Sequence, residues 1–389
     1  MRAPRMLYFG PMRKDWIRFD RNELAGAFGD IGTDLPLVVG VILAARLDVA
    51  SALIMFGVMQ VLTGLRYGIP MPVQPLKAMA ALVIAQKLSG SVLFGAGLVI
   101  GGIMLVLTVT GLIEWLARVV PKTVVRGIQF GLGLQLGMLA VKDYVQADGA
   151  VGYVLAAVAF VITVTLLGNR RFPAALFVIA VGVVYAFAFK LDFSAVWRGA
   201  GFRLPELHTF TGQDLLTGLV VLAIPQIPLS LGNSILATRQ IAEDFFPERH
   251  LTIRRISFTY SLMNLINPWF GGIPTCHGSG GMAGHYTFGA RTGGSVILYG
   301  SLYLLAGLFF SSGFGQLIQV FPKPILGVML AFEGLAMLLL VRDISGSKRD
   351  LLIAMLVGLM AVGLPYGYAV GLVVGTALVY LWHRREQTL

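Results

Sequence analysis

Two stretches of this sequence place helix-breaking residues next to groups that can bind a charge. The first, GIPMPVQPLKAMAALVIA (68–85), has three prolines at positions 70, 72 and 75, and Lys77 directly after them. The second, GGIPTCHGSGGMAGHYTFG (271–289), has Pro274 followed by four closely spaced glycines. Proline cannot donate a backbone hydrogen bond, and it disfavours helix in the residue before it. Both stretches therefore predict extended backbone that leads into a short helix.

The start of such a helix is suited to an anion. A helix N-terminus offers free N–H groups and about half a positive charge. We expect the first short helix to start near Pro75, which puts Lys77 in its first turn, and we expect Ser279 to add a hydroxyl donor in the second. Two N-termini, a lysine and a hydroxyl favour a small tetrahedral oxyanion. The alternative is that both breaks are kinks that let helices pack closely. A kink explains neither the lysine at position 77 nor the matching break in the second half of the chain.

Three acidic residues lie inside apolar segments and are candidates for carrying a coupled proton or cation. Asp30 and Asp34, in GDIGTDLP, are four positions apart and share one face of a helix that runs through both. Glu333 lies in the middle of LAFEGLAML. Structural alternatives stay open. The two aspartates could pair with an arginine or cap a broken helix, and Glu333 could simply accept hydrogen bonds from neighbouring donors.

A third proline-containing stretch, IPQIPLSLGNSILAT (224–238), adds neutral hydrogen-bonding groups. Pro225 and Pro228 predict an interruption of this segment. Its polar side chains, which we expect to line the same site, are Gln226, Ser230, Asn233 and Ser234.

A metal site or cofactor is not expected. The spacing of Cys276, His277 and His285 fits no common set of metal ligands. His277 is instead a candidate substrate-facing donor or proton carrier. Arg126 and Arg291 are near predicted segment ends and are interpreted as topology signals.

Composition limits the elements that can position these residues. Of 389 residues, 57% are hydrophobic and 13% are charged, whereas soluble domains carry about 25% charged residues. Apolar runs of about 18–25 residues recur along the chain. We therefore expect an all-α integral membrane protein with about fourteen transmembrane segments. Most of the 30 Lys and Arg fall in alternate loops, so the positive-inside rule places both termini in the cytoplasm and explains the net charge of +11 without nucleic acid.

A weak internal repeat predicts how the segments are arranged. GIP at 68–70 recurs at 272–274 and GSV at 90–92 recurs at 294–296, both shifted by 204 positions. VPKTVVRGIQFGLGL from Val120 resembles FPKPILGVMLAFEGL from Phe321. Three matches in order indicate a duplication. Because seven segments per copy is an odd number, the second copy is inverted, and the short half-helices at segments 3 and 10 point their N-termini at each other.

The expected organisation follows from this repeat. It comprises a cytoplasmic tail (1–20), a first membrane repeat (21–190), a linker (191–212), a second membrane repeat (213–383) and a cytoplasmic tail (384–389).

Four motifs together resemble the molybdate transporter family, which is related to the sulfate permeases. They are FGDIGTDLPLVVG, PMPVQPLKAMAA, PQIPLSLGNSILAT and CHGSGGMAGHYTFGARTGGSV. The resemblance implies the seven-plus-seven inverted repeat shared with sulfate and uracil/xanthine permeases, and molybdate as substrate, with tungstate and sulfate as competitors. The expected substrate-binding residues are Gln74, Lys77, Gln226, Asn233, Ser234, His277, Gly278, Ser279, Gly280 and Gly281.

Two features differ from related sequences. The sulfate permeases usually carry a STAS domain after the last segment, whereas this chain ends seven residues after Trp382, so we expect no such domain. Asp34 occupies a position where an uncharged residue is expected in many relatives, which indicates a different cation coupling.

The expected function is import of the oxyanion across the cell membrane by alternating access, with proton coupling as a hypothesis. Alternatives are a sulfate transporter or a nucleobase permease on the same fold, or a channel or anion sensor. A nucleobase site would need acidic residues where this chain has Lys77 and a glycine run. An enzyme is not expected, since neither HExxH nor GxSxG occurs. The expected partners are the oxyanion, the lipid bilayer and a second copy in a homodimer.

Overall fold

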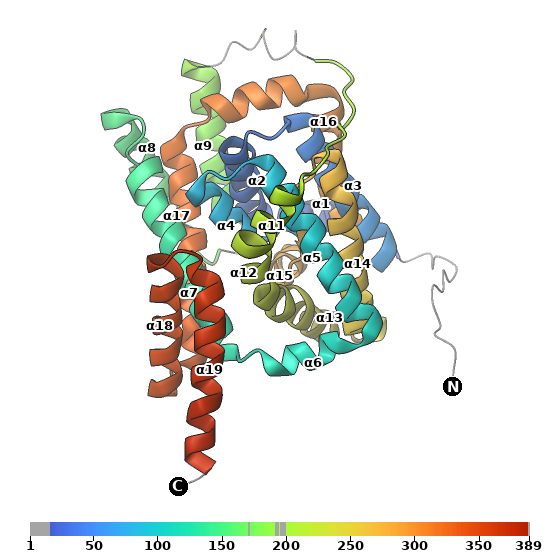
Figure 1. The fold of residues 1–389 in the computed structure, drawn as a ribbon. Helices are drawn as coiled ribbons and strands as arrows, with labels where there is room; N and C mark the ends of the chain where they lie inside the picture. Colours follow the sequence, from blue (N-terminus) through green and yellow to red (C-terminus); the bar gives the residue numbers. More distant parts are fainter. Residues whose placement is uncertain (1–15, 170–171, 191–193, 195–199, 388–389) are drawn as a thin grey trace.

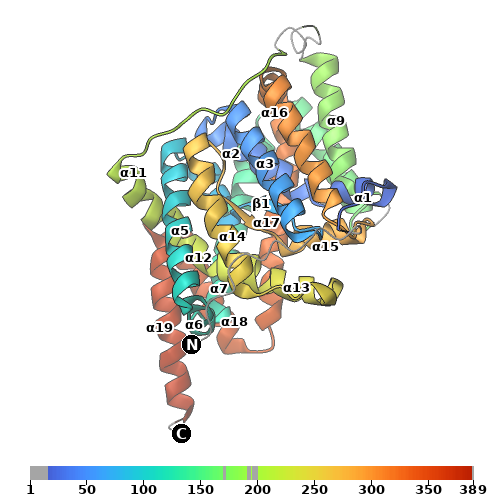
Figure 2. The same cartoon turned by 90° about the vertical axis from the view of Figure 1, so that its right-hand side faces the viewer.

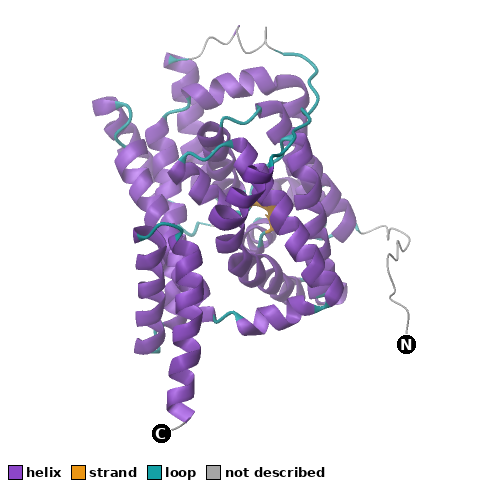
Figure 3. Ribbon diagram, viewed as in Figure 1, coloured by secondary structure: helices purple, strands orange, loops and turns teal. Residues whose placement is uncertain are grey.

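The structure, a computed structural model, describes residues 16–169, 172–190, 194 and 200–387 (Figure 1). Within these residues the chain is almost entirely helical and has one two-stranded sheet (Figure 3). The elements of the first half are α1 (Arg21–Ala27), α2 (Ile31–Ala45), α3 (Val49–Tyr67), β1 (Val73–Pro75), α4 (Lys77–Gln86), α5 (Gly90–Thr110), α6 (Leu112–Val119), α7 (Lys122–Leu139), η1 (Ala140–Tyr144), α8 (Gly149–Thr165) and α9 (Ala174–Phe189).

The second half contains the other strand. Its elements are α11 (Gly212–Thr217), η2 (Gly218–Ala223), α12 (Ile224–Leu229), η3 (Ser230–Ala237), α13 (Thr238–Phe245), η4 (Pro247–Arg249), α14 (Ile253–Ile266), η5 (Asn267–Phe270), β2 (Thr275–His277), α15 (Ser279–Thr287), α16 (Gly294–Val320), α17 (Lys323–Leu339), η6 (Leu340–Ile344), α18 (Lys348–Gly363) and α19 (Gly367–Gln387).

Several of these helices can cross a membrane. Six helical stretches among the described residues are long and apolar enough, and α1 with α2, bent by 43°, makes a seventh candidate. The six are Val49–Tyr67, Gly90–Thr110, Lys122–Tyr144, Gly212–Phe245, Gly294–Val320 and Lys323–Ile344. The structure thus confirms a mostly helical protein with several helices that can span a membrane. The expected count of fourteen segments stays a prediction.

The helices pack in two groups that lie side by side (Figures 1 and 2). In the first group, which comprises α1–α5 and α11–α16, α3 packs on α16, α5 on α14, and α15 on α1 and α13. In the second group, which comprises α7–α9 and α17–α19, α7 packs on α17, α18 and α19. The amphipathic helix α6 connects the two groups at one end (Figure 1).

The two broken stretches meet inside the first group. Strands β1 and β2 pair antiparallel, with Val73 opposite His277, Gln74 opposite Cys276, and Pro75 opposite Thr275. All six residues are buried. Helix α4 starts at Lys77, two residues after the expected start near Pro75, and Lys77 lies in its first turn as expected. Pro75 belongs to the strand.

Two amide side chains satisfy the strand backbone. Gln60 of α3 donates to the Val73 carbonyl oxygen (2.8 Å) and accepts from the Val73 N–H (3.0 Å). Asn264 of α14 does the same for Thr275, at 2.6 and 2.9 Å. These two amides are 204 positions apart, which is the shift of the sequence repeat. Each unpaired backbone group costs several kcal/mol away from water, so such partners allow extended backbone at this depth.

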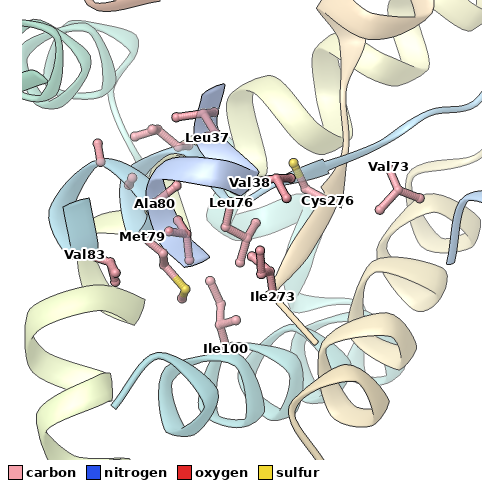
Figure 4. Close-up of a cluster of buried hydrophobic side chains, with 14 of the residues drawn as sticks. Leu37, Val38, Val73, Leu76, Met79, Ala80, Val83, Ile100, Ile273 and Cys276 are labelled. Carbon is pink, nitrogen blue, oxygen red and sulfur yellow. The ribbon is translucent and has the colours of Figure 1, made fainter. Parts of the chain in front are cut away.

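Apolar side chains hold α4 in place behind the strands. Leu76, Met79 and Val83 lie in a buried cluster with Ile100 of α5 and Ile273 before β2 (Figure 4). This packing fixes the position at which α4 begins.

Pro225 and Pro228 do not interrupt their segment, contrary to the sequence prediction. One helical stretch runs from Gly212 to Phe245. The backbone is π-helical on both sides of the prolines, at Gly218–Ala223 and Ser230–Ala237. In a π-helical turn, hydrogen bonds join residues five positions apart instead of four. This change of partners lets the helix continue past Pro225 and Pro228, which have no N–H to donate.

The expected domain boundaries are only partly within the described residues. Residues 1–15 of the expected tail, and 191–193 and 195–199 of the expected linker, lie outside them. Residues 200–211 of the linker form neither helix nor strand, and α19 continues to Gln387.

One buried carboxylate connects the start of the chain to α16. Glu23 of α1, which is 1% exposed, accepts hydrogen bonds from the backbone N–H groups of Arg291 (2.9 Å), Thr292 (2.8 Å) and Ser295 (3.0 Å). A carboxylate at this position satisfies donors at the start of α16 and interacts favourably with the helix dipole.

We predict that Glu23→Ala destabilises the protein by about 2 kcal/mol or more, because buried donors lose a charged acceptor. The readout is the midpoint of thermal unfolding of the purified protein in detergent. The control is Glu243→Ala, which removes an exposed carboxylate paired with Arg239. Equal unfolding midpoints for the two variants would contradict the assigned role.

Candidate functional site

A cavity of about 210 Å³ lies between the two helix groups. The first group contributes Gln74, Lys77, Gln226, Leu229, Asn233, Ser234, Cys276, His277, Gly278, Ser279 and Gly280. The second group contributes Gln129, Glu333, Ala336, Met337 and Leu340. The cavity thus brings together all the predicted substrate-binding residues except Gly281, and one of the three predicted coupling residues. Ser230, which was also expected to line the site, does not line the cavity.

The N-terminus of α15 opens into this cavity. Gly278 is its N-cap, and no described side chain caps the helix. A Cβ atom added at Gly280 would meet nothing within 4 Å, so this residue faces open space. The first N–H groups of α15 and the Ser279 hydroxyl are therefore placed to bind an anion.

The N-terminus of α4 is closed, which differs from the sequence expectation. The side-chain oxygen of Gln226 accepts from the N–H groups of Ala78 (2.9 Å) and Met79 (3.3 Å). The amide nitrogen of Gln226 donates to the Ser230 hydroxyl at 3.1 Å. Sequence spacing could not predict this cap, because α12 and α4 are almost 150 residues apart and meet only in the folded chain.

Lys77 is paired with Glu333 across the two groups. The Lys77 ammonium lies 2.6 Å from the Glu333 carboxylate, and the two side chains are 28% and 9% exposed. Thr33 of α2 donates to the other carboxylate oxygen at 3.4 Å. The predicted anion-binding lysine and the predicted coupling acid are therefore direct partners, and both face the cavity.

Asp30 and Asp34 lie behind the cavity wall. Asp30 is the N-cap residue of α2, at the bend after α1. Asp34 lies one turn later in the same helix, and its N–H donates to the Asp30 carbonyl oxygen at 3.1 Å, in line with the expected spacing on one face. The Asp30 carboxylate accepts from the Gln74 amide nitrogen at 2.6 and 2.7 Å. Gly281 packs against Asp30 instead of lining the cavity, and a Cβ atom there would overlap the carboxylate.

Asp34 is the most isolated of the three acids. It is 0% exposed, and neither of its oxygens accepts a hydrogen bond from a described donor. The Asp30 carboxyl group is close enough to interact with it electrostatically.

The strand residues His277 and Cys276 point to opposite faces, because side chains alternate along a strand. Cys276 shares a face with its partner Gln74. The His277 imidazole is bonded through Nε2 to the Thr259 hydroxyl (2.7 Å) and lies edge-on to Tyr67. Among the described residues, no three His, Cys, Asp or Glu side chains are grouped closely enough to hold a metal ion.

Gln129 is a cavity residue that the sequence reasoning missed. Its side-chain oxygen accepts from Arg126 at 2.8 Å, and Arg126 also contacts Asp343 of η6. From the sequence alone, Arg126 is interpreted only as a topology signal. The available signal was the spacing of three, which puts Arg126 and Gln129 on one helix face, but many such pairs have no function.

Comparisons with known proteins agree with this geometry. The profile of a family described as "Molybdate transporter of MFS superfamily" matches residues 22–136 and 218–337. The chain is 33% identical to Molybdate transporter 1 of Arabidopsis thaliana, over 93% of this chain and 88% of that protein. It is 34% identical to Molybdate transporter 2 of the same plant, over 90% and 86%. Molybdate transporter 1 of Chlamydomonas reinhardtii is 27% identical, over 94% and 93%.

Solved structures identify the fold. The transmembrane domain of the cyanobacterial bicarbonate transporter BicA superposes with a TM-score of 0.68 at 18% identity, covering 91% of this chain and 98% of that domain. The murine anion transporter Slc26a9 in its inward-facing state gives a TM-score of 0.68 at 14% identity, covering 95% of this chain and 69% of that one. The fold is therefore that of these anion transporters, although the family description names another superfamily.

The resemblance seen in the four sequence motifs is thereby confirmed, and the relatives are transporters, not enzymes. This chain is a multi-pass membrane protein that belongs to the molybdate transporter family.

Proposed function

We propose that this chain is a secondary active transporter that imports molybdate, and by the same contacts tungstate, through alternating access. The observation that carries the proposal is the open N-terminus of α15, which faces the same cavity as Lys77. The family of the chain supports molybdate as the substrate.

The proposed architecture is two inverted repeats of seven segments, at 21–190 and 213–383, with α4 and α15 as half-helices. The antiparallel pairing of β1 with β2 supports it, and so do the equivalent roles of Gln60 and Asn264. In such transporters the substrate binds near the midplane, and one bundle moves against the other. Here the moving units would be the two helix groups that enclose the cavity. The basic loops favour cytoplasmic termini in the cell membrane.

Bound molybdate would accept hydrogen bonds from the first N–H groups of α15 and from Ser279. Asn233 and Ser234 of η3 also line the cavity and offer neutral donors. Lys77 would supply a full positive charge. A dianion held by a helix N-terminus and one lysine resembles the phosphate sites of other proteins.

Glu333 connects anion binding to proton uptake in this proposal. A carboxylate and a dianion about 4 Å apart repel by roughly 8 kcal/mol at an effective dielectric constant of 20. Protonation of Glu333 removes this repulsion and releases Lys77 for the substrate. Asp30 and Asp34 are weaker candidates for this role, because they do not line the cavity.

Lys77→Ala should weaken molybdate binding by at least about 30-fold, because the partly buried cation that faces the anion is lost. Calorimetry with the purified protein measures this, and sulfate and uracil are titrated alongside to set the specificity. The control is Lys87→Ala, which changes an exposed lysine at the other end of α4. Uracil binding without oxyanion binding would show that the proposed substrate is wrong.

Uptake by the wild-type protein should rise as the external pH falls, because protonated Glu333 no longer holds Lys77. Glu333→Gln mimics the protonated state, so its uptake should lose most of this pH dependence. Radiolabelled molybdate uptake into proteoliposomes at a series of external pH values measures both. The companion variants are Asp30→Asn and Asp34→Asn. If all three variants keep the wild-type pH profile, none of these acids carries the coupled proton.

A further inference from the structure

Gln129 is, with Glu333, one of the two polar side chains that the second helix group contributes to the cavity. It lies on α7 in the second group, whereas α15, η3 and Lys77 all belong to the first. Its side chain is 1% exposed. A ligand that touches both Gln129 and the start of α15 would therefore bridge the two units that enclose the cavity.

The orientation of the Gln129 amide is fixed by its neighbour. Arg126 Nη1 donates to Gln129 Oε1 at 2.8 Å. A guanidinium group has donors only, so the amide must turn its oxygen toward Arg126. Arg126 is itself held by Asp343, which also lies 3.5 Å from the Lys122 ammonium. The amide therefore cannot flip without losing this contact.

The opposite end of the same amide has no partner. Gln129 Nε2 is buried, and it donates to no described acceptor. Buried donors are almost always paired, and leaving one unpaired costs about 1–3 kcal/mol. Gln129 lines the cavity, so a ligand bound in the cavity can supply the missing hydrogen-bond acceptor.

We propose that Gln129 Nε2 donates a hydrogen bond to the transported oxyanion, with Arg126 as the positioning residue that keeps this donor turned to the ligand. This inference rests on the proposed function, in which the cavity binds an anion. A tetrahedral oxyanion suits the arrangement because its four oxygens accept from several sides at once. One ion can then contact the α15 N-terminus on one wall and Gln129 on the other.

The first test is calorimetric titration of molybdate into the purified full-length protein. Gln129→Met keeps the length and volume of the side chain but removes the donor, and it should weaken binding about 10-fold or more, as expected for a hydrogen bond to a charged group. The matched control is Gln135→Met on the same helix, whose side chain accepts from Tyr368 and does not line the cavity. This control should bind molybdate like the wild type. Thermal unfolding of each variant checks that it is folded.

A double-mutant cycle tests the role of Arg126. Arg126→Met frees the amide to rotate and should weaken molybdate binding, whereas Arg126→Lys keeps a donor for the amide oxygen and should restore part of it. In the Gln129→Met background the effect of Arg126→Met should shrink, because there is no amide left to orient. Equal effects in both backgrounds would overturn the positioning role.

The outcomes separate this inference from the proposed function. If the wild type and the Gln135→Met control bind no molybdate, the proposed function fails, and this inference fails with it. If the wild type binds molybdate and folded Gln129→Met binds it equally tightly, the inference alone is overturned.

Discussion

The antiparallel pairing of β1 with β2 satisfies backbone that would otherwise be unpaired in the interior of a membrane protein. Only a few residues of each broken segment are extended, and their hydrogen bonds go to each other and to the amides of Gln60 and Asn264. The pairing has a second consequence, because it fixes where α4 and α15 begin. Both helices start within two residues of their strand, so their N-termini are held beside one cavity by backbone geometry. The ligand contacts proposed for Lys77, Ser279 and the first N–H groups of α15 depend on this short sheet.

The two N-termini are used differently in the structure. Gln226 caps α4, whereas the first turn of α15 is open to the cavity. The positive charge near α4 is also engaged, because Lys77 is paired with Glu333 of the other group. An arriving dianion would therefore find neutral donors ready on α15 but would have to compete for Lys77. In the proposed mechanism, competition of this kind would link substrate binding to the protonation of Glu333 and to the contact between the two groups.

The sequence predicted those features that local chemistry controls. Prolines at 70, 72 and 75 indicated an extended segment before a short helix, and the apolar composition indicated a helical membrane protein. The predicted residues at the first break, Gln74 and Lys77, and those at the second, His277 to Gly280, do line one cavity. Features that depend on tertiary contacts were not predicted. The Gln226 cap on α4 and the contact of Arg126 with Asp343 each require segments that meet only after folding. The bend at Asp30 was missed because the GDIG stretch contains no proline.

A structure of the protein with bound molybdate would test the central claim most directly. Molybdenum scatters X-rays anomalously, so its position can be assigned without relying on the shape of the density. We predict one molybdenum site in the cavity, with oxygens within hydrogen-bonding distance of the Gly280 N–H and the Ser279 hydroxyl, and with Lys77 turned from Glu333 toward the anion. Molybdenum located outside this cavity, or bound with the α15 N-terminus uninvolved, would contradict the account.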